Sequence, residues 1–73
     1  MKKVDNYFLK CFGDNLRSIR KQKKITQEQL ANDVNIEISQ ISRIERGVVN
    51  TSISNVHLIA TALHIETKKM FDF

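Results

Sequence analysis

Hydrophobic positions recur along the chain at three- and four-residue steps, which is the spacing of one face of an α-helix. The first such stripe consists of Phe8, Phe12, Leu16, Ile19 and Lys23. It predicts a helix over about residues 8–23, bordered on its apolar side by Arg20, four residues beyond Leu16. We expect residues 1–5, which precede the stripe, to be frayed.

A second helix is predicted to begin at Thr26, because residues 26–29 read Thr-Gln-Glu-Gln, the Thr-x-x-Gln form of a capping box. Its inward positions are Leu30, Ala31 and Val34. Asn35 then stands where a left-handed turn residue is needed, and asparagine tolerates that backbone conformation best after glycine.

A third helix is expected from about Glu37 to Arg46, with Gly47 as its left-handed cap. Its buried side carries isoleucines at positions 38, 41 and 44. At 100° per residue, Ser39, Ser42, Arg43 and Arg46 gather within about 60° on the opposite side. That outward side carries hydroxyls and guanidiniums and no acid.

The remaining apolar positions predict two more helices. Ser52 is the expected N-cap of a fourth helix whose inward set is Ile53, Val56, Ile59, Ala60 and Leu63. A short fifth helix over about residues 67–71 brings Met70 and Phe71. Residues 1–73 are therefore predicted to form a single compact all-α domain of five short helices.

The composition of the chain excludes several classes of function, although it says little about the fold. A chain of 73 residues has too small a core for a large catalytic cleft. Cys11, His57 and His64 are the reactive side chains, and their spacing matches no zinc motif; Cys11 borders the first apolar stripe, and both histidines are expected in surface or capping positions. We therefore predict no enzyme activity, metal, cofactor or small-molecule ligand.

The same composition bears on location. One cysteine permits no internal disulfide, which fits a reducing compartment. No apolar run approaches the ~20 residues of a membrane span, and charge interrupts the N-terminal apolar positions, so we read no signal peptide. We expect a soluble, cytoplasmic protein.

Charge is unevenly distributed along the chain. The net charge is +4, and residues 1–24 hold eight of the twelve lysines and arginines against two acids. A basic end suits a polyanion as partner. An ordinary solvated surface explains the same charges equally well.

The second and third predicted helices, joined by three residues, have the form of a helix-turn-helix over about residues 26–46. Small Ala31 permits a close crossing, and Val34, Ile41 and Ile44 lock the pair at one angle. The outward side of the third helix then fits the DNA major groove, which is about 12 Å wide and admits one helix. Helical hairpins that bind no DNA share this pattern, so it does not establish binding alone.

Residues from about Phe12 to Phe71 resemble the phage-repressor type of helix-turn-helix regulator, the Xre/Cro-like family. The resemblance is carried by "TQEQLA", "ISRIERG" and "IATALHI", in the family's order and spacing. It implies a five-helix, lambda-repressor-like fold and a homodimer that binds a palindromic operator and regulates transcription. Among relatives, "RIERGVVNTSIS" is similar to the arginine–glycine–asparagine loop of restriction–modification controller proteins.

The resemblance also suggests which residues touch DNA. It implies that positions near base edges or the groove are Gln27, Ile38, Ser39, Gln40 and Arg43. Ile38 departs from the polar residue usual there, and it either contacts a thymine methyl or forms the edge of the core. Glu37 departs from the usual Ser or Thr. Its charge suits a helix N-terminus. Its carboxylate either accepts a hydrogen bond from cytosine N4 or points away from the DNA.

Arg43 is the strongest candidate for sequence discrimination, because arginine can bind guanine O6 and N7 with two hydrogen bonds. The alternatives for Arg43 are a phosphate contact or a solvated side chain. Predicted phosphate contacts, which position without reading sequence, are Thr26, Ser42, Arg46, Asn50 and Thr51. The alternative for Arg46, Asn50 and Thr51 is a simple capping loop in which the arginine is solvated.

Glu45 lies four residues beyond Ile41 and so faces the core, where an unpaired carboxylate is very costly. The resemblance implies that it pairs with Arg20. We predict a structural clamp between the first and third helices that touches no base.

Apolar residues near the end of the chain predict a dimer interface: Ile65, Met70, Phe71 and Phe73. Their alternative role is to complete the core of a single copy. The alternative function for the whole chain is an antitoxin, or another protein-interaction module, that also binds its own promoter.

Overall fold

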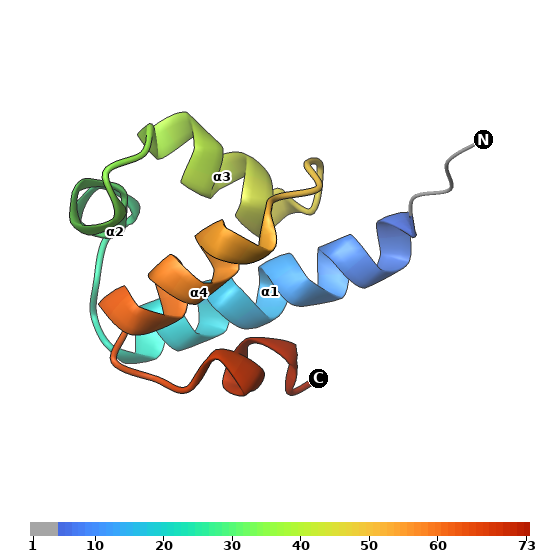
Figure 1. Cartoon of the computed structure of the whole chain (residues 1–73). Coiled ribbons are helices and arrows are strands. Elements are labelled where there is room, and N and C mark those ends of the chain that lie inside the picture. The colour runs from blue at the N-terminus through green and yellow to red at the C-terminus, as the bar shows by residue number, and fades with distance from the viewer. Residues whose placement is uncertain (1–4) are drawn as a thin grey trace.

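A computed structural model describes residues 5–73 of the chain. These residues form α1 (Asn6–Gln22), α2 (Gln27–Val34), α3 (Ile38–Arg46), α4 (Ile53–Ala62) and the 3-10 helix η1 (Thr67–Phe71), and they contain no strand. Figure 1 shows α1 and α4 crossing the middle of the molecule, with α3 on one side and η1 on the other. The predicted all-α fold is confirmed; its fifth element is a tight 3-10 turn rather than an α-helix.

Helix α1 begins two residues before its predicted start. Asp5 is its N-cap, and the Asp5 Oδ1 atom accepts a hydrogen bond of 3.0 Å from the Phe8 backbone N–H. We predicted fraying of residues 1–5, and positions 1–4 of this range lie outside the described residues. Lys23 was placed on the buried stripe, and this is wrong: it is the exposed C-cap of α1.

The core draws side chains from every helix, including η1. Its buried members are Phe12, Leu16, Leu30, Ala31, Val34, Ile41, Ile44, Val56, Ile59, Ala60, Leu63 and Met70. Ile53 was predicted to join them, but its side chain is 87% exposed. Ile53 is the first residue of α4, and the core ends at Val56, one turn further along, so nothing covers it.

Two glycines allow α1 to lie directly against the end of α3. A Cβ atom on Gly13 would sit 2.4 Å from the carbonyl oxygens of both Ile44 and Glu45. Gly47 ends α3 with a left-handed φ of 73°, and a Cβ there would meet Lys10 Cα at 2.6 Å. Because side chains at these sites would push the backbones apart, the glycines fix the position of α3.

The C-terminal segment is fastened to α1. The Asn15 side-chain amide donates to the carbonyl oxygens of Lys69 (3.0 Å) and Met70 (2.9 Å). The Phe71 ring packs 5.2 Å from the Phe12 ring and 6.3 Å from the Phe8 ring, centroid to centroid. These contacts hold η1 in place and place aromatic rings beside the first turns of α1.

Candidate nucleic-acid interface

The segment from α2 to α3 adopts the conformation that its sequence predicts. Thr26 Oγ1 accepts from the Gln29 N–H at 3.0 Å, and Gln29 Oε1 accepts from the Thr26 N–H at 2.8 Å, which completes the capping box. Asn35 is left-handed with φ 63°. Three residues thus separate two helices whose buried sides share one core.

The side of α3 that faces away from the core carries polar side chains. Ser39, Arg43 and Arg46 are exposed, and Gln40 and Ser42 are half-buried. Arg43 Nη1 donates to Gln40 Oε1 at 3.5 Å, and Arg46 Nε donates to Ser42 Oγ at 3.3 Å. These long bonds between exposed groups are weak, so most of the guanidinium N–H groups remain available to another molecule.

The buried side of α3 carries the predicted ion pair, which is confirmed. The Arg20 and Glu45 side chains are only 9% and 4% exposed. Arg20 Nε donates to Glu45 Oε2, and Arg20 Nη2 donates to Glu45 Oε1 at 3.0 Å. Two parallel bonds of this kind give geometric specificity as well as energy. The hydrogen bond to Glu45 raises the pKa of Arg20, so the guanidinium stays charged.

Two further bonds extend this pair into a clamp that joins α1, α2 and α3. Arg20 Nη1 donates to the Ile25 carbonyl oxygen at 2.9 Å. Gln27, the first residue of α2, donates from Nε2 to Glu45 Oε1 at 3.0 Å. We call these residues, Arg20, Ile25, Gln27 and Glu45, the clamp. No buried side-chain polar atom among the described residues lacks a partner.

The sequence did not reveal that Gln27 belongs to the clamp. It was expected beside the DNA, and in this conformation its amide nitrogen points to Glu45. The amide has a second N–H, so a phosphate contact remains compatible with this bond.

Ile38 and Glu37 stand at the beginning of α3. Ile38 is its first residue and is 47% exposed, and Ile38 is not among the residues of the core cluster. Glu37 is the exposed N-cap and makes no side-chain capping bond. Of the two predicted roles for Ile38, the structure therefore disfavours the edge of the core.

The residues predicted to contact phosphate fall in two places. Thr26, Ser42 and Arg46 lie on α3 or at the start of α2. Asn50 and Thr51 follow α3 and border an apolar hollow, and Thr51 Oγ1 accepts from the Asn55 amide at 3.2 Å.

The residues predicted for a dimer interface are also divided. Phe71 and Phe73 are 45% and 55% exposed, and Ile65 is half-buried against the core. Met70 is completely buried. This corrects the prediction for Met70: its side chain fills the core of a single copy and offers no surface to a second one.

The reactive side chains form no metal-binding group in the part of the chain that the structure describes. Among the described residues no three His, Cys, Asp or Glu side chains are grouped as a metal site would require. His57 is exposed and shares a 3.0 Å hydrogen bond with Thr67, and Cys11 is half-buried. Within residues 5–73 no helix has both the length and the apolar character that crossing a bilayer demands.

Two short helices at a fixed angle, the second with an uncovered polar side, define the class of helix-turn-helix proteins. Residues 16–69 match the model of the HTH_3 family, described as helix-turn-helix. The chain belongs to this family of transcription regulators.

Three comparisons illustrate its relatives. Control protein C.BamHI from Bacillus amyloliquefaciens is 40% identical over 63 residues, 85% of this chain and 78% of that protein. The immunity repressor of Bacillus phage phi105 is 41% identical over 54 residues, 74% of this chain but 38% of the repressor. The crystal structure of the restriction-modification controller C.AhdI from Aeromonas hydrophila superposes with a TM-score of 0.88 at 38% identity, covering 90% of this chain and 96% of that one. These proteins are named as regulators and not as enzymes.

Proposed function

We propose that the chain is a cytoplasmic transcription regulator that binds a palindromic operator in double-stranded DNA as a homodimer, with α3 in the major groove. The observation that carries this proposal is the two-sided construction of α3. One side is fixed to α1 and α2 through the clamp. The other presents Ser39 and Arg43 to solvent.

The chemistry of the outward side suits base edges and phosphates. Arg43 has donors for guanine, and Ile38 has exposed methyl groups for a thymine methyl. Arg46, Ser42 and Thr26 flank them as donors for phosphate oxygens. The acid on the buried side is fully engaged, so it does not repel the DNA from within the groove.

The names of the relatives support a controller role. C.BamHI is named a control protein and C.AhdI a restriction-modification controller. Both match most of this chain and are mostly covered by it. We therefore propose that this chain is a controller of the same kind.

A titration of isotope-labelled protein with a mixed-sequence DNA duplex tests the binding surface without knowledge of the operator. We expect amide shifts to concentrate at residues 26–28 and 38–46, and to shrink as salt rises, because phosphate contacts release counterions. Shifts of α1 and η1 alone, or binding that does not respond to salt, would contradict this mode of binding.

A further inference from the structure

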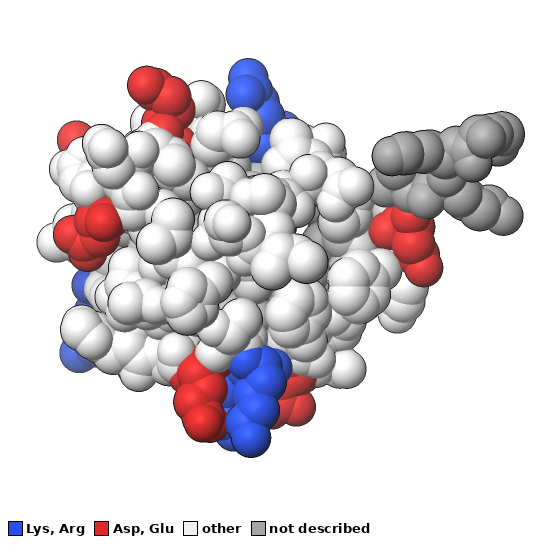
Figure 2. All heavy atoms as spheres, in the orientation of Figure 1, with Lys and Arg blue, Asp and Glu red and all other residues white. Residues whose placement is uncertain are grey.

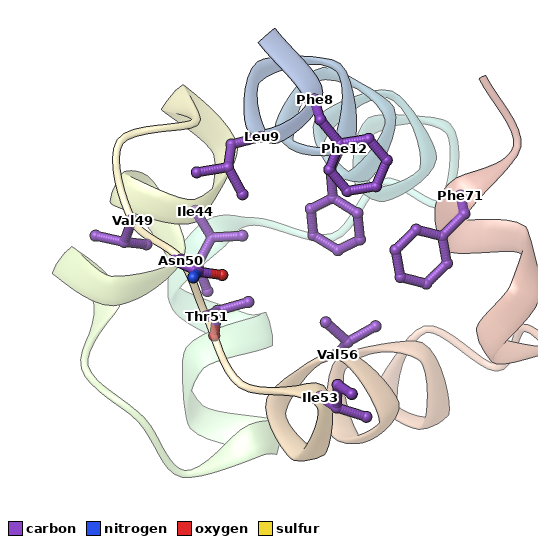
Figure 3. Close-up of a pocket in the computed structure, with 10 residues that line it drawn as sticks. All are labelled: Phe8, Leu9, Phe12, Ile44, Val49, Asn50, Thr51, Ile53, Val56 and Phe71. Atoms are coloured by element: carbon purple, nitrogen blue, oxygen red, sulfur yellow. The ribbon is translucent and has the colours of Figure 1, made fainter. Parts of the chain in front are cut away.

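The two ends of α3 border hollows of different chemistry. The hollow at the C-terminal end has a volume of about 190 Å³, and Figure 3 shows apolar side chains such as Phe12, Ile44 and Val56 around its open centre. None of the residues that line it is charged. The hollow at the N-terminal end has a volume of about 630 Å³, lies between α2 and α3, and has Glu28 and Glu37 in its wall. Carboxylates therefore stand beside the beginning of α3.

The segment that carries α2 and the beginning of α3 is acidic, although the chain as a whole is basic. Residues 25–42 contain Glu28, Asp33 and Glu37 and no lysine or arginine, whereas the net charge of the chain is +4. Figure 2 shows acidic side chains over α2 and the beginning of α3, at the left of the view. Phosphates repel negative charge, so an acid beside DNA lowers the affinity for every sequence unless it gains a bond from the DNA.

The Glu37 carboxylate is not engaged within the protein. Glu37 is the exposed N-cap of α3 and makes no side-chain capping bond, and it enters no ion pair within residues 5–73. The N-caps of α1, α2 and α4 each accept a hydrogen bond from a backbone N–H of their own helix; they are Asp5, Thr26 and Ser52. A helix without this bond is less stable, and departures from such local rules are expected at functional sites. The N-cap side chain of α3 is thus free to contact another molecule.

Glu37 also adjoins the outward side of α3. Gln40, three residues later, borders the same hollow and accepts the 3.5 Å bond from Arg43. Ile38, the next residue after Glu37, is 47% exposed. When the second helix of a helix-turn-helix lies in the major groove, its N-terminal residues contact base edges. With α3 placed as proposed, the Glu37 carboxylate therefore reaches the base edges.

We infer that Glu37 is a specificity-determining residue that selects cytosine at one position of each half-site, an inference that rests on the proposed function. In the major groove cytosine presents the N4 amino group, from which a carboxylate accepts, whereas guanine presents the acceptors N7 and O6 and thymine the acceptor O4. Adenine has a donor at N6, but its N7 acceptor lies beside that donor and repels the second carboxylate oxygen. Glu37 therefore favours cytosine by attraction and disfavours the other bases by repulsion.

The first test compares two substitutions that each remove a negative charge from the wall of the same hollow. Glu37→Gln changes the residue that contacts the base, and Glu28→Gln changes an exposed residue of α2. Sites are selected from random DNA, and affinities are then measured on duplexes that differ only at the selected position. We expect the wild type and Glu28→Gln to prefer cytosine there. Glu37→Gln should prefer adenine, because a glutamine amide matches adenine N6 and N7.

The affinities have a sign that a purely electrostatic role of Glu37 cannot produce. On the duplex with cytosine, Glu37→Gln should bind on the order of tenfold to a hundredfold more weakly than the wild type. On a mixed-sequence duplex both variants should bind more tightly, because each has lost a negative charge. If Glu37→Gln strengthens binding to every duplex by the same factor, the side chain points away from the bases and the inference is overturned. A changed preference at a base other than cytosine overturns it as well.

A substitution that keeps the charge tests the reach of the carboxylate. Glu37→Asp has a shorter side chain, and an aspartate N-cap accepts from the backbone N–H groups of its own helix. We expect this variant to unfold at a higher temperature than the wild type and to lose most of the preference for cytosine. An unchanged preference would show that charge alone matters, which overturns the inference. Glu37→Gln should unfold at the wild-type temperature, because Glu37 is exposed and makes no capping bond.

The outcomes separate this inference from the proposed function. If the wild type selects a sequence and Glu37→Gln selects the same one, base recognition by Glu37 is wrong and the DNA-binding regulator stands. If the wild type selects no sequence, the proposed function fails and the inference fails with it.

Discussion

The two sides of α3 carry charged residues in opposite circumstances. Glu45 is buried and accepts hydrogen bonds from Arg20 and Gln27. Arg43, two residues earlier, is exposed and has one long bond to Gln40. A buried charge whose bonds are all made inside the protein fixes geometry and has nothing left for a ligand. The exposed charge keeps most of its N–H donors free, which suits a group that binds another molecule.

The largest expected effect comes from removing the buried carboxylate of Glu45. Glu45→Ala leaves Arg20 buried without its partner, and we expect it to reduce the free energy of unfolding by about 3–5 kcal/mol. Urea denaturation measures this. As a control, Arg20→Met with Glu45→Leu replaces the pair by apolar side chains and should cost less than Glu45→Ala alone. A Glu45→Ala protein as stable as the wild type would show that the ion pair does not stabilise the fold.

The second prediction concerns the close approach of α1 and α3. Gly13→Ala puts a methyl group 2.4 Å from two carbonyl oxygens of α3, so a backbone has to shift. Overpacking of this kind costs about 1–3 kcal/mol, and we expect weaker DNA binding because α3 moves.

Ser18→Ala, at an exposed position of the same helix, is the control and should change stability by less than about 0.5 kcal/mol. Equal thermal stability of the two variants would mean that α1 and α3 are not in contact.

The third prediction concerns Arg43, on the outward side of α3, and its part in discriminating between DNA sequences. Arg43→Ala should leave stability within about 0.5 kcal/mol of the wild type and lower discrimination at one position of each half-site by about 1–3 kcal/mol. Binding to duplexes that differ at single positions measures this. Arg43→Lys keeps the charge but not the paired donors, so it should lose the same discrimination. An equal loss of affinity for every sequence would make Arg43 a backbone contact.

The smallest expected effect is at Arg46. If it contacts one phosphate, Arg46→Ala should reduce the slope of log affinity against log salt by about 0.9 and leave the preferred sequence unchanged. Lys68→Ala, an exposed residue of η1, should leave the slope as it is. A changed sequence preference for Arg46→Ala would assign Arg46 to a base instead.

Features set by neighbouring residues were predictable from the sequence. The capping box at Thr26, the left-handed Asn35 and Gly47, and the Ser52 cap each depend on a few adjacent positions, and each is confirmed. The direction of Glu45 followed from helical spacing, and its pairing with Arg20 was implied by the resemblance to the family. Both appear in the structure.

Features set by distant parts of the chain were not predictable. Helical spacing places Ile53 on the same side as Val56, but it cannot show that the core ends before Ile53. Met70 has the composition of an interface residue, and only the fold shows that it fills the core. Gln27 had no visible link to Glu45, 18 positions away. The close approach at Gly13 was not predictable either, because the atoms that a Cβ would meet there belong to Ile44 and Glu45, far along the chain.

A selection of bound duplexes from random DNA tests the central claim most directly, when the wild type is compared with Arg43→Ala. The account predicts a palindromic site for the wild type, with half-sites about 10 base pairs apart. It predicts that Arg43→Ala selects the same palindrome with one base position relaxed symmetrically in both halves. No enriched sequence for the wild type, or the same enriched sequence for both proteins, would contradict the claim that the outward side of α3 reads DNA.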